Sequence, residues 1–213
     1  MKEKILTIDT EPSDKGLQKG LSKGELTFIA HRYEKKDLDK FRKLFESWLG
    51  MVESKAFFNE SDTLDTAGRA VNLPEELSEG VVAKDIKGVY RYRKQIKNKF
   101  GKSKFDCYNI KTQEFIEVKG CCIKPDLTTW SSLPYFDVLY FVDFSSRDGK
   151  YKIFEINITN EELKKVKVNS TETFEEQINS TRRPRFPLYE KFVEPKYKCS
   201  GSPCVSGDLY SDD

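Results

Sequence analysis

Histidine is almost absent from this chain, with His31 alone among 213 residues. Ser-His-Asp catalysis, Cys-His catalysis and histidine-rich metal sites would all have to depend on that one side chain. An excess of charge of either sign is also lacking, because 37 Lys and Arg offset 35 Asp and Glu to a net charge of +2. This balance excludes a histone-like polycation, so a nucleic-acid site must be a local basic patch.

Long apolar runs are lacking too. No run approaches 18 residues, so the sequence predicts no membrane-spanning helix. Residues 1–4 (MKEK) lack the apolar core of a signal peptide, and the five cysteines have no regular spacing. We therefore expect a chain of a reducing, cytoplasmic compartment. Charged residues make up 34% and aromatic residues 13%, which supplies a surface and a core and excludes general disorder.

The length predicts a single domain, spanning residues 1–213, with decorations at its ends. Apolar residues spaced by three and four predict a helix over residues 34–58, which is either a scaffold helix or a dimer contact. We expect residues 1–60 to form an N-terminal helical extension. Residues 197–213, rich in Gly, Ser and Asp, are expected to form a flexible tail.

A second helix is expected to open at residue 72. Asn72 is its predicted N-cap, and Pro74 suits its first turn. Gly80 and Gly88 are expected to limit its length.

From residue 105 the hydrophobic period becomes that of strands. Residues 105–110 and 114–122 predict a hairpin around a turn at 111–113. Residues 135–144 form a nearly continuous apolar run, which is typical of a central strand, and residues 151–158 alternate as a further strand. With helical pieces expected over 159–180, these patterns predict an α/β (α+β-like) fold in which helices flank a mixed sheet.

The pattern acid-x-Lys occurs seven times in the chain, but only Glu117-Val118-Lys119 lies inside an apolar strand. The two-residue period of a strand places Glu117 and Lys119 on one face and Val118 on the other. Asp106, on the partner strand of the hairpin, is expected opposite Glu117 or Val118. Buried charges at these places require a partner or a metal.

Two converging carboxylates repel each other, and a divalent cation relieves that repulsion. Oxygen ligands select Mg²⁺, which can polarise a phosphoryl oxygen and activate a water while Lys119 stabilises developing charge. The alternative is a structural network of Asp106, Glu117 and Lys119. Glu75 and Glu79 share a helix face. They are either an ordinary acidic first turn or place Glu79 as a further metal or water ligand.

Two segments are strongly basic. Residues 84–104 hold nine Lys or Arg and one acid, so they form either a solvated face or a phosphate-binding surface. Residues 182–186 (RRPRF) form either a basic surface turn or a rigid loop whose arginines read guanine edges. The predicted DNA-binding residues in these two segments are Arg91, Arg93, Lys94, Lys97, Arg182, Arg183 and Arg185.

Asp106 followed by Glu117-x-Lys119 on a hairpin resembles the PD-(D/E)XK nuclease signature, although Phe105 stands where that signature has proline. The wider sequence, from about residue 69 to 195, resembles small type II restriction endonucleases. The segments that carry the likeness are residues 72–75, 78–79, 117–119, 126–128, 137–141 and 182–186. As a set they are similar to enzymes that cut at GCNGC.

The resemblance implies a restriction-endonuclease-like core and Mg²⁺-dependent cleavage of double-stranded DNA by a homodimer at a short palindrome. It also implies a prokaryotic host and a possible companion methyltransferase. Asp106 and Glu117 would be metal ligands, Lys119 the catalytic lysine, and Glu79 the carboxylate from a helix. Two alternatives stay open: a structure-specific nuclease of the junction-resolvase or repair type, and a non-catalytic nucleic-acid-binding module.

Overall fold

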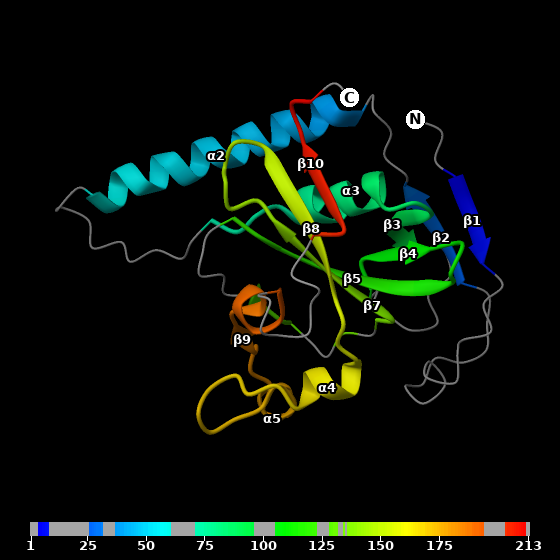
Figure 1. Ribbon diagram of the computed structural model, residues 1–213, viewed down its shortest axis with the longest axis vertical. Coiled ribbons are helices and arrows are strands. Elements are labelled where there is room, and N and C mark those ends of the chain that lie inside the picture. The colour runs from blue at the N-terminus through cyan, green and yellow to red at the C-terminus, as the bar shows by residue number, and fades with distance from the viewer. Residues whose placement is uncertain are drawn as a thin grey trace.

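A mixed β-sheet with helices on both faces forms the body of the molecule (Figure 1). The computed structural model describes residues 4–8, 26–31, 37–60, 71–95, 105–122, 128–131, 134, 136–193 and 203–211. The strands of the main sheet, in spatial order, are β1 (Lys4–Ile8), β2 (Leu26–His31), β3 (Val89–Gln95), β4 (Cys107–Asn109), β5 (Glu114–Cys121), β7 (Val138–Asp143), β8 (Lys150–Ile156) and β10 (Val205–Asp208). The pair β5–β7 is parallel and the other neighbours are antiparallel.

The predicted hairpin and central strands are confirmed as β4, β5, β7 and β8. Gln113 takes a positive φ of 60° in the turn between β4 and β5. Strand β7 is buried along almost its whole length, as its continuous apolar run predicts. The expected α/β class with a mixed sheet is therefore confirmed.

One face of the sheet packs against helices α2 (Leu38–Glu60) and α3 (Glu75–Asp85) (Figure 1). The aromatic side of α2 lies in this core, where Phe45 and Trp48 are almost completely buried. The interpretation of this aromatic side as a dimer contact is therefore wrong, because the chain's own sheet already covers it. Among the described residues, no helix combines the length and the hydropathy that a membrane span needs.

Helix α3 differs from its sequence prediction in two ways. The residue before its first turn is Pro74, and no side chain caps the helix there, so Asn72 is not the N-cap. Gly80 lies inside the helix instead of limiting it. A Cβ on Gly80 would come within 2.5 Å of the Phe41 ring, so glycine is needed where α2 and α3 touch. Gly88, with φ of +89°, does follow the helix end.

The opposite face of the sheet packs against α4 (Asn160–Lys164), α5 (Phe174–Asn179) and a π-helix, η2 (Tyr189–Val193). Both α4 and α5 begin with a capping box, built on Thr159 and Thr173. A small second sheet, β6 (Thr128–Thr129) paired with β9 (Arg185–Phe186), lies on this side. The expected helical pieces over 159–180 are confirmed.

Both ends of the chain depart from expectation. Of residues 1–36 the structure describes strands β1 and β2, so the described part of the N-terminal extension is helical only over α2 and its adjoining turn. Residues 203–211 are not a frayed tail, because β10 pairs with β8 and Leu209 is fully buried. Pairing at a sheet edge satisfies backbone groups whatever the side chains are, so a polar segment can form a strand there.

Candidate active site

The hairpin brings Asp106 beside Glu117. Strands β4 and β5 pair with Cys107 opposite Ile116, which places Asp106, one residue before β4, next to Glu117. The backbone N–H of Asp106 donates to the Ile116 carbonyl over 3.0 Å, and the Val118 N–H donates to Oδ2 of Asp106 over 2.9 Å. The expected position of Asp106 opposite Glu117 or Val118 is therefore confirmed, with Glu117 as its neighbour.

Glu117 and Lys119 lie on the face of β5 that the strand period predicts. Ile116 and Val118 join the core with α2 and α3, so Glu117 and Lys119 point to the opposite face. Nζ of Lys119 lies 2.5 Å from Oε1 of Glu117, and both side chains are largely buried. The same ammonium lies 4.7 Å from the ring centroid of Trp130.

A third carboxylate comes from α3. Glu79 is buried, and its Oε2 forms an ion pair with Nε of Arg91 from β3, while Glu76 lies 3.5 Å from the same guanidinium. Helix α3 approaches β5 closely at Gly120, where an added Cβ would lie 2.9 Å from both Leu73 and Ser78. The missing side chain at Gly120 thus lets the start of α3 lie against the strand of Glu117 and Lys119.

Burial and mutual repulsion raise the pKa values of these carboxyl groups. Burial is the main cause of the rise at Glu117, whose pKa is about 7; Lys119 opposes the rise and Asp106 adds to it. Burial also raises the pKa of Glu79, to about 8, with a further rise from Asp106 that the ion pair with Arg91 does not cancel. Asp106 therefore acts electrostatically on both other carboxyl groups.

The pKa values of Asp106 and Lys119 also depend on the charges around them. Burial raises the pKa of Asp106, against the opposing effects of Lys119, the Val118 N–H and Arg91. Burial lowers the pKa of Lys119, but the carboxylates of Glu117 and Asp106 outweigh it, so the net direction is upward. Lys119 thus stays protonated among three acids.

The donor set suits a hard divalent cation. Glu117 and Glu79 are buried and Asp106 is half-buried, and these carboxyl groups interact with two cationic side chains, Lys119 and Arg91. The described residues hold no group of three or more His, Cys, Asp or Glu side chains that could together surround a metal. Mg²⁺ commonly binds through one or two carboxylates, with water and substrate phosphate in its other positions. Asp106 and Glu117 fit that requirement.

The basic segments lie in different surroundings. Arg91 belongs to the acidic centre through Glu79 and Glu76, although the sequence suggested a DNA contact for it. Arg93 and Lys94 are on strand β3 at positions where only the backbone is described, and Lys97 lies outside the described residues. Their predicted role in DNA binding stays a prediction.

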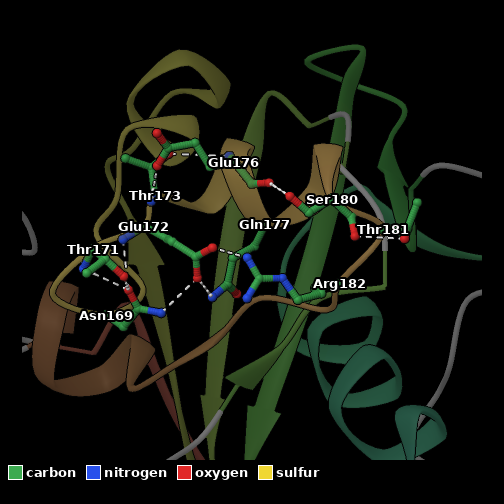
Figure 2. Close-up of polar contacts among 9 residues, drawn as sticks. All are labelled: Asn169, Thr171, Glu172, Thr173, Glu176, Gln177, Ser180, Thr181 and Arg182. Atoms are coloured by element: carbon green, nitrogen blue, oxygen red, sulfur yellow. Dashed lines mark hydrogen bonds and ion pairs between the residues drawn. The ribbon is translucent and has the colours of Figure 1, made fainter.

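The 182–186 loop is anchored by its first arginine. Figure 2 shows the Arg182 side chain directed at Glu172, with which it forms an ion pair. Glu172 also accepts hydrogen bonds from Asn169 and Gln177, each over 3.1 Å. These hydrogen bonds, chiefly the one from Arg182, lower the pKa of Glu172 to about 2. Arg182 therefore holds the loop to the segment that precedes α5.

The other two arginines of the loop remain at the surface. Arg183 and Arg185 are both exposed, and Nε of Arg185 donates to Oγ1 of Thr129 over 3.0 Å. Pro184 accepts a backbone hydrogen bond from Trp130, so the loop has a second attachment. Of the three arginines, Arg183 and Arg185 are thus placed to meet a ligand.

Sequence reasoning missed the contacts that cross between elements. No role was predicted for Trp130 from the sequence, because its contact with Lys119 follows from no spacing along the chain. The pairing of Arg91 with Glu79 was missed because the surrounding basic run suggested phosphate contact instead. A pattern search restricted to strand and helix periods has no means of finding either contact.

Comparison with known proteins gives two matches. The model of the Bsp6I restriction endonuclease family matches residues 33–195. The type II restriction enzyme Bsp6I of Bacillus sp. (strain RFL6) is 28% identical over 165 residues, which cover 77% of this chain and 87% of that protein. No solved structure gives a significant match to the chain.

Proposed function

The chain belongs to the Bsp6I restriction endonuclease family, and from this premise we propose that it cleaves double-stranded DNA at a short palindrome in a Mg²⁺-dependent reaction. Its class of activity, site-specific deoxyribonuclease, follows from the family and its type II relative. The proposed site of cleavage rests on one observation, the cluster of Asp106, Glu117 and Lys119 on the β4–β5 hairpin. The resemblance of the sequence favours GCNGC as the site.

In this proposal Asp106 and Glu117 hold the metal ion. When bound, Mg²⁺ supplies positive charge to a phosphoryl oxygen and lowers the pKa of a water. Lys119 is held 2.5 Å from Glu117 and stays charged, so it is available to stabilise the negative charge that grows on the phosphate. Glu79 and Arg91 interact electrostatically with Asp106, whose carboxylate is held by the Val118 N–H.

The DNA would be held by the two basic segments. Lysine is a flexible point charge suited to phosphates, whereas arginine presents a planar fork that matches guanine edges. We therefore assign phosphate contacts to the mostly lysine segment, at Arg93, Lys94 and Lys97, and base contacts to the arginine loop, at Arg183 and Arg185. Arg182, held by Glu172, supports the loop that presents them.

Cleavage of both strands of a palindrome needs two centres related by a two-fold axis, so we propose a homodimer in the cytoplasm of a prokaryotic host. A companion methyltransferase would protect the host's own sites. Light scattering that finds a monomer, both free and on a cognate duplex, would contradict the dimer.

The test compares unbranched and branched duplex DNA as substrates. Purified protein should cut plasmid DNA into discrete bands in Mg²⁺, leave it intact in EDTA, and bind it without cutting in Ca²⁺. Cleavage confined to four-way or flapped duplexes would instead identify a structure-specific nuclease. Binding with no cleavage in any divalent metal would identify a non-catalytic module.

A further inference from the structure

Trp130 joins the cleaving centre to the arginine loop. Its ring centroid lies 4.7 Å from Nζ of Lys119. Its backbone N–H donates to the Pro184 carbonyl over 3.0 Å, and the strand that precedes it pairs with Arg185 and Phe186. One residue thus contacts the ammonium proposed to act in cleavage and the loop proposed to read bases.

The orientation of the indole is set by aromatic rings. Trp130 is 1% exposed. It stacks on Phe186 at an interplanar angle of 16° with centroids 6.3 Å apart, and it meets Phe174 nearly edge-on, at 83° and 5.6 Å. Since Phe186 is part of β9, a shift of the arginine loop must shift the indole as well.

The indole nitrogen indicates that Trp130 has a role besides packing. Nε1 of Trp130 is buried and has no hydrogen-bond partner within the described part of the chain. A buried donor without an acceptor is unfavourable, and phenylalanine would avoid it. Tryptophan does offer the strongest ring face for a cation, and that face is the one Lys119 meets.

Lys119 needs such a second contact. Its side chain is flexible, and its ammonium lies 2.5 Å from Glu117, which the proposed function assigns to the metal. If Glu117 turns toward a metal, the ring face of Trp130 is the contact that still holds the ammonium in place.

We propose that Trp130 is a positioning residue for DNA cleavage, holding the Lys119 ammonium on its ring face and making that position depend on how the Pro184–Phe186 segment is seated. The inference rests on the proposed function, because it takes Lys119 as part of the cleaving centre. It predicts that cleavage, rather than stability or binding, depends on this indole.

The first test compares the two tryptophans. Trp130→Phe and Trp48→Phe both replace a buried indole by a smaller ring, but Trp48 also donates through Nε1 to the Val71 carbonyl over 3.4 Å. Phenylalanine offers a cation a weaker ring face than tryptophan, so Trp130→Phe should lower the single-turnover cleavage rate about 3- to 10-fold, less than loss of the whole cation–π contact would. Its affinity for cognate duplex in Ca²⁺ should stay unchanged. Trp48→Phe should lower the urea midpoint further and leave the cleavage rate as in wild type.

Equal cleavage rates in the two variants would overturn the proposal. So would a rate in Trp130→Phe that falls only as far as its folded fraction falls. Failure of the proposed function would look different, because the wild-type protein itself would then leave all DNA uncut in Mg²⁺.

The second test needs neither cleavage nor metal. Protein labelled with 5-fluorotryptophan should give two fluorine resonances, which Trp48→Phe assigns. Lys119→Met should shift the Trp130 resonance and leave that of Trp48 in place, because only Trp130 faces the ammonium. A Trp130 resonance that ignores Lys119→Met would overturn the proposed contact.

The same label tests the link to the loop. Cognate duplex in Ca²⁺ should shift the Trp130 resonance, whereas a scrambled duplex should not. Equal shifts with both duplexes would show that the loop does not transmit recognition through this indole.

Discussion

The backbone N–H of Val118 donates to the carboxylate of Asp106 over 2.9 Å. Val118 is the residue between Glu117 and Lys119, so this bond fixes Asp106 to the stretch of strand that carries the other two charges. A hydrogen bond between a backbone donor and a carboxylate is among the stronger ones in proteins. The relative positions of the three side chains are therefore set by the hairpin itself.

Neutralising any member of this cluster should stop cleavage. We expect Asp106→Asn, Glu117→Gln and Lys119→Met each to lower the cleavage rate about 100-fold or more, the scale of losing one group that stabilises transition-state charge. The far-ultraviolet circular dichroism should stay that of the wild type. Wild-type activity in Asp106→Asn would exclude a metal site with two protein ligands.

A second acid-x-Lys triplet supplies the matched control. Asp148 and Lys150 have the same spacing and are 3.3 Å apart, but they lie exposed at a turn. Asp148→Asn and Lys150→Met should therefore cut DNA at the wild-type rate. Loss of cleavage in these variants would contradict the assignment of cleavage to the hairpin cluster.

Stability without metal should depend on pH in a defined direction. The pKa values of Glu117 and Glu79 are raised from 4.5 to about 7 and about 8. Between these limits the folded protein keeps protons that the unfolded chain has released, so stability falls as pH rises from about 4.5 to about 8. Urea unfolding in EDTA should show this fall, and Glu79→Gln with Glu117→Gln should flatten it. A double variant with the wild-type slope would contradict the raised pKa values.

The three arginines of the loop should give different phenotypes. Arg183→Ala and Arg185→Ala should each weaken cognate binding by about 1–3 kcal/mol and random-sequence binding little, if they read bases. Arg182→Ala should instead loosen the loop, because Arg182 is paired with Glu172. Glu172→Gln should then reproduce the effect of Arg182→Ala. Binding titrations in Ca²⁺ on cognate and scrambled duplexes separate these cases, and equal losses on both duplexes would make Arg183 and Arg185 phosphate contacts.

The lysines of the basic segment should contribute to DNA binding whatever the sequence of the duplex. Neutralising Lys94 and Lys97 should weaken binding to all duplexes and reduce the salt dependence by a slope of about 1 per lost phosphate contact. Salt titrations on the same pair of duplexes measure both effects. An unchanged slope of the salt dependence would show that these two residues do not contact DNA phosphates.

Local patterns allowed part of this structure to be predicted from the sequence. The β4–β5 hairpin follows from strand period and a short turn, and it carries Asp106, Glu117 and Lys119 together. Among the acid-x-Lys triplets that the structure describes, only Glu117–Lys119 lies wholly inside a strand, and it is the triplet of this cluster. The cluster could be predicted because its three members lie within fourteen residues of one another.

The features that were missed depend on contacts between distant segments. β10 forms because the edge of β8 accepts a partner, which the polar sequence of residues 203–211 does not signal. Gly80 lies inside α3 because Phe41 of α2 occupies the space of a side chain, a fact of tertiary packing. The positions of Arg91 and Trp130 were hidden for the same reason. The hydrophobic period describes one helix or strand at a time, whereas each of these contacts joins two elements.

The most direct measurement is to digest phage DNA with the purified protein in Mg²⁺ and to sequence the fragment ends. We expect all ends to fall at one short palindromic sequence, and the Asp106→Asn protein to produce none. Ends spread over unrelated sequences, or DNA left whole by the wild-type protein, would contradict it.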